Sequence, residues 1–338
     1  MKKLNFIIKY GLALLLLSFY SCESWLNVTP SDRLSEEMLF NDREGFVKAL
    51  NGVYIELNTN ELYGRNLTAG ALDVMGQYYS VASSSHAFYN YGGLVYTGND
   101  EKALFDNMWQ KCYAVIACCN TIIEKCDENK AGLSPVWKGS IKGEALALRA
   151  MLHFDMLRLF GPLTSELDKE SIPYQTNSDQ TVTPLLSGSE VIGLILDDLK
   201  NAVGLLKDTD PYFVEEEFSD TDLNYRRFRM NYFAAKGLMA RVQLWGGDKE
   251  KAAITAKEVI AEGQAEGAEF FPFVTNSEAT SSNPDRVFYS EVLFGTYHSS
   301  REKLHEDLFA PTLESTSILT LAGTARRDDL YDNENDYR

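Results

Sequence analysis

The sequence GEALALRAMLHFDMLRLFGP, residues 143–162, decides the fold of this chain. Its apolar residues recur with the period of an α-helix, and Gly161-Pro162 ends the helix. They fall on two separate sides: Leu148, Leu152, Met156 and Leu159 on one, and Leu146, Ala150, Phe154 and Leu157 on the other. Two narrow polar strips lie between these sides, Arg149 with His153 and Asp155 with Arg158. A helix at the edge of a globular protein needs one apolar side, so we expect this helix to lie between two neighbouring helices.

Other segments continue the helical pattern. Periodicity predicts helices over 42–57, 104–126, 136–160 and 189–206, and a helix–turn–helix over 228–263 around Gly246-Gly247-Asp248. This last unit resembles a tetratricopeptide hairpin, and we expect four helix pairs in total. Residues 58–103 are expected to be irregular, and the alternation over 287–297 predicts a short strand. The predicted fold is all-α dominated: a tetratricopeptide-like superhelix of helical hairpins with irregular loops and a little β structure.

The N-terminus, residues 1–21, has the features of a lipoprotein signal peptide. A basic segment with three lysines is followed by an apolar run over 11–20, which is too short to span a bilayer. Ser21 then precedes Cys22, as at a lipoprotein cleavage site. We expect cleavage before Cys22 and its lipidation; the alternative is an ordinary secretory signal with a chance cysteine. Residues 22–338 contain no obvious linker and are expected to form one helical-repeat domain.

The charge balance excludes some partners. Removal of residues 1–21 takes the formal net charge from −17 to −20, because three lysines and no acidic residue are lost. So acidic a protein is unsuited to nucleic acid and is repelled by anionic lipid head groups. Attachment to a membrane must then come from the acyl chains on Cys22.

The cysteines, histidines and short motifs give no sign of catalysis. Cys112, Cys119 and Cys126 lie seven residues apart on one helix side, at separations of ~10 Å that exceed disulfide reach. We expect buried, unpaired thiols and no metal site. The four histidines are not spaced as helical metal ligands, and His153 is expected to be a hydrogen-bonded structural residue. Nucleophile, phosphate-loop and zinc motifs are absent from the sequence. We therefore expect a protein that is not an enzyme and has no cofactor.

The most distinctive candidate for a ligand-binding region is the segment 74–99. It contains no Asp, Glu, Lys or Arg across 26 residues, in a chain that is 24% charged. Neutral sugars need flat aromatic faces and uncharged hydrogen-bonding groups. The candidate ligand-binding residues are Tyr78, Tyr79, Phe88, Tyr89, Asn90 and Tyr91, with Phe288, Tyr289, Tyr297 and His298 as weaker candidates. The alternative is a buried loop that covers the helices, with its tyrosines anchored by hydrogen bonds.

Two helices together carry a family resemblance. The residues are Gly143-Glu144-Ala145, Arg149-Ala150, Phe154 and Phe160-Gly161-Pro162-Leu163, preceded by Trp109, Tyr113, Ile116, Asn120, Ile122 and Ile123. This pattern resembles the RagB/SusD family, outer-membrane lipoproteins of Bacteroidetes that capture nutrients, mostly glycans. The resemblance runs from the lipoprotein signal to about Trp245 and is looser beyond it. Members usually continue well past position 338, so we expect a C-terminal part of the family to be missing.

The resemblance implies a function and a partner. It predicts a lipid-anchored protein at the cell surface that binds a glycan and delivers it to a SusC-like TonB-dependent outer-membrane transporter. Three other functions remain open: capture of a peptide on the same scaffold, a tetratricopeptide-like scaffold that binds only proteins, and a glycosidase. A glycosidase would need two carboxylates roughly 5–10 Å apart in a cleft.

Overall fold

The computed structural model describes residues 36–321, apart from 180, 220, 221, 223, 266 and 267, together with 328. The predicted signal peptide and Cys22 lie outside the described residues. The helices, strands and 3₁₀ turns are α2 (Glu36–Leu39), α3 (Arg43–Leu57), α4 (Ala71–Met75), β1 (Tyr79–Ser80), α5 (Tyr89–Gly92), α6 (Asn99–Glu128), α7 (Pro135–Phe160), β2 (Glu170–Pro173), β3 (Leu185–Ser187), α8 (Gly188–Thr209), η2 (Glu215–Glu217), η3 (Arg226–Phe228), α10 (Tyr232–Trp245), α11 (Lys249–Gly263), β4 (Gln264–Ala265), β5 (Ala268–Glu269), α12 (Asn276–Ala279), η4 (Tyr289–Glu291), α13 (Arg301–Leu308) and β6 (Thr320–Leu321).

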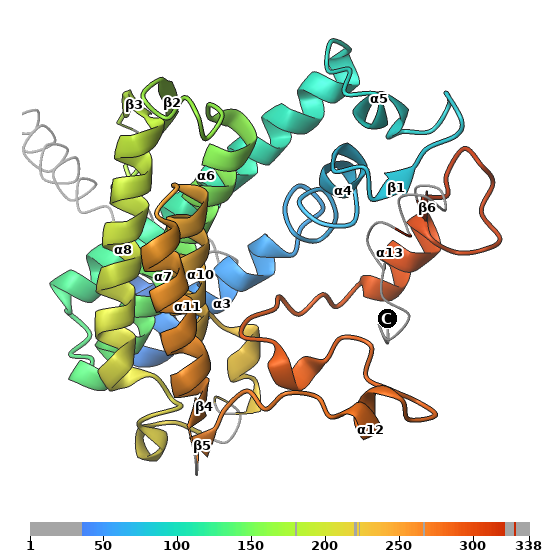
Figure 1. Cartoon of the computed structure of the whole chain (residues 1–338). Helices are drawn as coiled ribbons and strands as arrows, with labels where there is room; N and C mark the ends of the chain where they lie inside the picture. The colour runs from blue at the N-terminus through green and yellow to red at the C-terminus, as the bar shows by residue number, and fades with distance from the viewer. Residues whose placement is uncertain are drawn as a thin grey trace, which may run out of the picture.

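In the described part of the chain, the body is formed by the six long helices α3, α6, α7, α8, α10 and α11, which Figure 1 shows packed side by side. Going along the chain, α6, α7, α8, α10 and α11 each pack against the next, and α3 packs against α6 and α7. The described strands form three two-stranded sheets. The expectation of a helix-dominated fold with little β structure is confirmed. The closer likeness to tetratricopeptide hairpins stays a prediction. In the described part of the chain, no helix is both long and apolar enough to cross a bilayer.

Helix α7 is buried on both of its sides, as its sequence predicted. Leu148, Leu152 and Met156 on one side and Ala150 and Leu157 on the other are essentially inaccessible to solvent. The helix packs between α6 and α8, and its side chains belong to one continuous core with those of α3, α8 and α10. The two apolar stripes thus correspond to two neighbouring helices.

Local sequence signals determine where α7 begins and ends and how closely it approaches α8. The Ser134 hydroxyl accepts a hydrogen bond from the backbone N–H of Trp137, Pro135 occupies the first turn, and Gly161 follows the last residue. A Cβ atom on Gly143 would lie 2.7 Å from Cγ of the buried Leu206 in α8. Glycine at the start of the 143–162 motif therefore allows these two helices to approach closely.

The four cysteines of α6 are free thiols. Cys112, Cys119 and Cys126 are buried, as predicted, whereas Cys118 is exposed. Burial raises the pKa of Cys126 to about 12, which keeps that thiol protonated. Helix α6 begins at Asn99, five residues before the predicted start.

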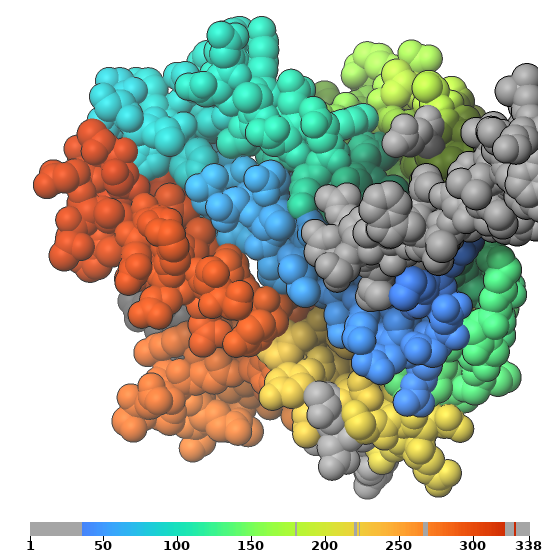
Figure 2. All heavy atoms as spheres, turned by 180° about the vertical axis from the view of Figure 1, so that it is seen from behind, coloured from blue at the N-terminus to red at the C-terminus, as the bar shows by residue number. Residues whose placement is uncertain are grey.

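Two segments far apart in the sequence form a loop layer at one end of the helical body (Figures 1 and 2). We define the loop layer as residues 58–98 together with residues 296–321. Strands β1 and β6 pair antiparallel, with Tyr79 opposite Leu321. A small second core joins the two segments, made by Ala71, Val74, Phe88, Tyr91, Leu308 and Leu319. The loops 58–98 are thereby held in place by residues more than 200 positions later in the chain.

The predicted strand over 287–297 is wrong. The segment contains the 3₁₀ turn η4, and Phe288 before it has a left-handed backbone, with φ of 52°. The Asp285 carboxylate accepts hydrogen bonds from the backbone N–H groups of Val287 at 3.0 Å and Tyr289 at 2.7 Å. These local bonds favour a turn over a strand. The alternating apolar residues pack instead against separate neighbours: Tyr289 against Phe228 and Leu293 against the main core.

Candidate functional site

The charge-free segment 74–99 is mainly an anchor for the loop layer. Phe88 and Tyr91 are only 5% and 2% exposed and belong to the small second core. Tyr79 is half-buried, with its ring centroid 5.3 Å from that of Phe309. Asn90 donates a hydrogen bond to Glu101 Oε1 at 2.8 Å. Burial raises the pKa of Tyr91 to about 12.

Two of the predicted ligand residues present their rings to solvent. Tyr78 is 46% exposed and Tyr89 43%. Packing explains the absence of charge only at the few buried positions of this segment, such as Phe88 and Tyr91, because most of its residues are exposed. Ligand binding by Tyr78, Tyr79, Phe88, Tyr89, Asn90 and Tyr91 stays a prediction, and the geometry narrows the accessible aromatic candidates to Tyr78 and Tyr89.

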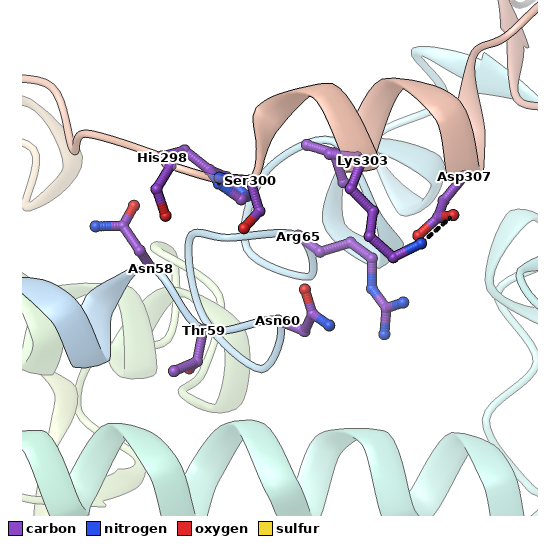
Figure 3. Close-up of a pocket in the computed structure, with 10 residues that line it drawn as sticks. Asn58, Thr59, Asn60, Arg65, His298, Ser300, Lys303 and Asp307 are labelled. Carbon is purple, nitrogen blue, oxygen red and sulfur yellow. Dashed lines mark hydrogen bonds and ion pairs between the residues drawn. The ribbon is translucent and has the colours of Figure 1, made fainter.

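A polar cavity of about 310 Å³ lies within the loop layer (Figure 3). It opens between the turn that follows α3 and the first turns of α13. Its lining consists almost entirely of hydroxyl, amide and charged side chains: Asn58, Thr59, Asn60, Arg65, His298, Ser299, Ser300, Lys303, Leu304 and Asp307. Leu304 also packs against the small second core. The cavity and the segment 74–99 are therefore parts of one layer.

His298 fixes the two walls of the cavity relative to each other. Its Nδ1 accepts a hydrogen bond from the backbone N–H of Ser300 at 3.1 Å. The proton is then on Nε2, which donates to the Gly64 carbonyl at 2.8 Å. A Cβ atom on Gly64 would lie 2.2 Å from the Asn58 carbonyl oxygen, so the tight turn requires glycine. A short, hydrogen-bonded turn thus presents residues 58–65 to α13.

The remaining polar groups give the cavity its binding character. Asn58 donates through Nδ2 to the Tyr54 carbonyl at 2.8 Å, but its buried Oδ1 accepts no hydrogen bond within the described structure. Arg65 donates through Nε to Asn66 Oδ1 at 3.2 Å. Lys303 pairs with Asp307 at 2.9 Å at the exposed rim. Amide and hydroxyl groups of this kind are suited to a ligand rich in hydroxyls.

An exposed aromatic ring lies next to this lining in the sequence. Tyr297 precedes His298, is 59% exposed, and packs edge-on against Phe228 with 5.6 Å between ring centroids. Among the weaker sequence candidates, His298 is therefore at the cavity and Tyr297 adjoins it, whereas Phe288 and Tyr289 are outside its lining. Sequence reasoning missed Asn58, Thr59, Asn60 and Arg65 because they belong to the irregular segment 58–103. The run Asn58-Thr59-Asn60 after a helix end was the available signal.

A second hollow, of about 640 Å³, has a different character. It lies between α7, α10 and the segment 292–296 and is lined mostly by apolar residues such as Met151, Phe154 and Leu238. Asp155 within it already accepts a hydrogen bond from the Tyr63 hydroxyl at 2.6 Å. The polar cavity is thus the better match to a sugar.

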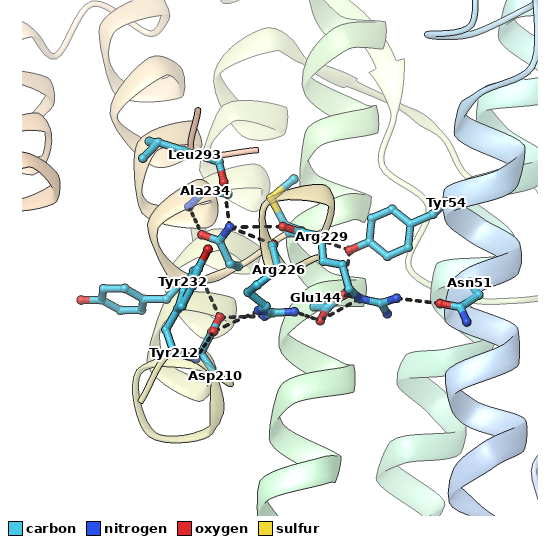
Figure 4. Close-up of polar contacts among 12 residues, drawn as sticks. Asn51, Tyr54, Glu144, Asp210, Tyr212, Arg226, Arg229, Tyr232, Ala234 and Leu293 are labelled. Carbon is cyan, nitrogen blue, oxygen red and sulfur yellow. Dashed lines mark hydrogen bonds and ion pairs between the residues drawn. The ribbon is translucent and has the colours of Figure 1, made fainter. Parts of the chain in front are cut away.

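A buried ion-pair network connects α7 to its surroundings beneath the loops (Figure 4). Arg226 is 1% exposed and pairs with Glu144 and with Asp210, the latter at 2.7 Å. Glu144 also accepts hydrogen bonds from the Tyr54 hydroxyl at 2.7 Å and from Arg229 Nε at 3.1 Å. Burial alone would raise the pKa of Glu144, but the Arg226 and Arg229 guanidiniums outweigh burial and hold it below its usual value. These carboxylates act as structural partners of arginines.

Comparisons with known proteins support the family resemblance that the sequences of α6 and α7 indicate. A family model described as "Starch-binding associating with outer membrane" matches residues 24–244. SusD-like protein P2 of Formosa agariphila is 26% identical over 265 residues, which cover 76% of this chain and 46% of that protein. A SusD-like protein of Bacteroides ovatus is 30% identical over 146 residues, which cover 42% of this chain and 23% of that protein. The chain thus spans at most about half the length of these curated relatives.

Solved structures share the fold. A SusD superfamily protein from Bacteroides thetaiotaomicron aligns with 88% of this chain and 63% of its own, with a TM-score of 0.63 at 20% identity. A SusD-like carbohydrate binding protein from Bacteroides vulgatus aligns with 71% of this chain and 47% of its own, with a TM-score of 0.56 at 23% identity. Because the family model matches well over half of the sequence, the chain belongs to the SusD-like family, described as starch-binding and associated with the outer membrane.

Proposed function

We propose that this protein captures a glycan at the cell surface and delivers it to a TonB-dependent outer-membrane transporter. The observation that carries the proposal is the family match over residues 24–244. The polar cavity of the loop layer supports it, because the lining offers amide and hydroxyl groups for sugar hydroxyls. One structural relative is named a carbohydrate binding protein.

Tyr78 and Tyr89 would add stacking surfaces for sugar rings. Both rings are substantially exposed and lie in the same layer as the cavity. Stacking contacts of this kind contribute about 0.5–1.5 kcal/mol each beyond area burial. Glycan binding at this layer is then expected to be modest in affinity and sensitive to the loss of two rings.

Calorimetry of the purified full chain against a panel of oligosaccharides tests the proposed function. The double variant Tyr78→Ala/Tyr89→Ala and the cavity variant Asn60→Ala should each weaken binding of the oligosaccharide that binds the parent protein. Ile254→Ala, which removes an exposed apolar side chain from α11 on the helical body, is the matched control. No binding across the panel, or losses equal to that of the control, would count against glycan capture at this layer.

The proposed role is binding without turnover. The carboxylates Glu144 and Asp210 are held in buried pairs with Arg226, which leaves them as structural groups. Incubation with the same oligosaccharide panel should release no reducing ends. Sustained release that one Asp or Glu substitution abolishes would instead assign glycosidase activity.

The proposed anchor is Cys22. It follows Ser21 at the end of the apolar run, and the acidic surface cannot provide electrostatic attachment to anionic lipid. Cys22→Ala should prevent labelling with a palmitate analogue and remove the protein from the outer-membrane fraction. Unchanged labelling and fractionation would show that Cys22 is not the lipidated residue.

A further inference from the structure

The polar cavity contains more positive than negative charge, in a chain with a formal net charge of −17. Arg65, Lys303 and Asp307 are the charged residues of its lining. The Lys303–Asp307 pair lies at the rim and is largely solvated, with side chains 71% and 51% exposed. Arg65 is half-buried in the wall of the cavity, where its charge is less screened by water than a surface charge is.

The Arg65 guanidinium can still bind a ligand. Within the described structure its one hydrogen bond runs from Nε to Asn66 Oδ1. The two Nη groups form a planar fork that suits a carboxylate or a sulfate. Figure 3 shows the Arg65 side chain extending between the turn that carries Asn60 and the helix that carries Lys303. Arg65 belongs to the lining, so its side chain borders the space that a ligand would enter.

Two other features of the cavity complement Arg65. Asn58 Oδ1 is a buried acceptor without a donor among the described residues, so a turn of the Asn58 side chain toward the cavity would let a ligand hydroxyl satisfy it. At the opposite wall Ser300 precedes α13 and makes no side-chain capping hydrogen bond. The first N–H groups of a helix have no intrahelical acceptor, and they carry partial positive charge. The lining thus offers an acceptor for a hydroxyl and several donors for an oxyanion.

We propose that this cavity selects an acidic sugar, with the carboxylate or sulfate group of one sugar residue at Arg65 and a neighbouring hydroxyl at Asn58 Oδ1. This inference rests on the proposed function and narrows its substrate class. A neutral sugar would leave the guanidinium fork with water as its partner, whereas an oxyanion would form charge-assisted hydrogen bonds with it. Asp307 at the rim opposes this selection through its own negative charge.

Paired oligosaccharides test the substrate class. Calorimetry compares the full chain against oligogalacturonate and its neutral methyl ester, and against a sulfated galactan oligosaccharide and its desulfated form. At least one charged probe should bind ten or more times more tightly than its neutral partner, and the difference should shrink as salt is raised. The uronate and sulfate pairs distinguish the two possible oxyanions.

Variants that change single charges test whether Arg65 causes the preference for the charged oligosaccharide. Arg65→Gln should abolish the preference for the charged probe, and Arg65→Lys should retain part of it. Asp307→Asn should tighten binding of the charged probe, a gain that misfolding cannot produce. Lys257→Gln removes an exposed positive charge from α11, outside the cavity lining, and should leave the preference unchanged. Thermal melting checks that each variant is folded.

The outcomes separate this inference from the proposed function. Binding of neutral probes as tightly as charged ones, or a preference that persists in folded Arg65→Gln and does not increase in Asp307→Asn, overturns the acidic-sugar inference alone. Failure of every charged and neutral oligosaccharide to bind overturns both.

Discussion

At the scale of single residues, α7 carries buried charge on both of its sides, and each charge has a specific partner. Arg149 binds Asp198 through two hydrogen bonds of 2.7 Å, and the Tyr174 hydroxyl donates to the same carboxylate at 2.6 Å. Toward the start of the helix, Glu144 pairs with Arg226. Charged groups on the enclosed faces of the helix cannot reach water, so they must be paired. Glu144 and Arg149 therefore belong to the sequence motif for a structural reason.

Removal of the Arg226 guanidinium should strongly destabilise the folded protein. Arg226→Met would leave Glu144 and Asp210, which are 3% and 0% exposed, without their shared cation. Breaking a buried ion pair in this way destabilises a protein by about 3–5 kcal/mol. Lys48→Met, which breaks the exposed pair with Glu44, is the control and should leave stability unchanged within error. Urea unfolding of both variants measures the difference, and equal midpoints would contradict the structural role of Arg226.

His153 should make stability depend on pH. It is fully buried, its Nε2 accepts from the Gln175 N–H at 3.0 Å, and its Nδ1 contacts the Arg149 carbonyl at 2.9 Å. Burial lowers the pKa of His153 to about 3 from 6.5. Between these values the unfolded chain binds a proton that the folded protein does not, so the contribution is fully present above pH 6.5 and is lost as the pH falls.

The contribution of His153 should appear as a slope in the free energy of unfolding plotted against pH. The free energy of unfolding should fall by about 1.4 kcal/mol per pH unit between roughly pH 6 and pH 4 because of His153. Carboxylates titrate in the same range, so the measurement is the difference between the parent protein and His153→Gln. The variant should be less stable at neutral pH but should show a slope smaller by about one proton. Parallel pH profiles would show that His153 is not the titrating group.

At the scale of elements, the long helices were predictable from sequence, whereas the short helices α4, α5, α12 and α13 and the loop layer were not. Helical periodicity and caps are local signals, and α7 begins one residue before its predicted start and ends where predicted. The burial of Phe88 and Tyr91 depends on Leu308 and Leu319, which are more than 200 residues away in the sequence. The polar cavity likewise requires the meeting of residues 58–65 with α13. No local pattern specifies such a meeting, so only fragments of the site, such as His298, were accessible to sequence reasoning.

The close contact between α7 and α8 can be tested with a matched pair of glycine variants, one in the contact and one outside it. A Cβ atom on Gly143 would meet Leu206 Cγ at 2.7 Å, whereas one on Gly204, exposed on α8, would meet nothing within 4 Å. Gly143→Ala should destabilise the protein by about 1–3 kcal/mol through overpacking. Gly204→Ala should stabilise it by about 0.5–1 kcal/mol because alanine loses less entropy in a helix. The melting temperatures of the two variants should therefore shift in opposite directions. Shifts of the same sign would show that helix propensity, and not the close contact, determines the change in stability.

At the scale of the whole molecule, the proposed ligand site lies in the loop layer and adjoins the helical body at the end of α3. The loop layer lies at one end of the six long helices (Figure 1), and the buried faces of α7 and α10 are enclosed in the core. A partner protein must therefore contact loops or outward helix faces.

The proposed partner is a SusC-like TonB-dependent transporter, over whose mouth this protein would act as a lid. Affinity purification from outer membranes solubilised in mild detergent should recover a large membrane protein together with this chain at near-equal stoichiometry. A helical-repeat body offers a broad face for such docking, and the anchor at Cys22 would hold both proteins in one membrane. Cys22→Ala should therefore reduce recovery from membranes, while purified Cys22→Ala protein added back in excess should still bind the transporter. Recovery of this protein alone, with its ligand present, would indicate a surface binder that works without a dedicated transporter.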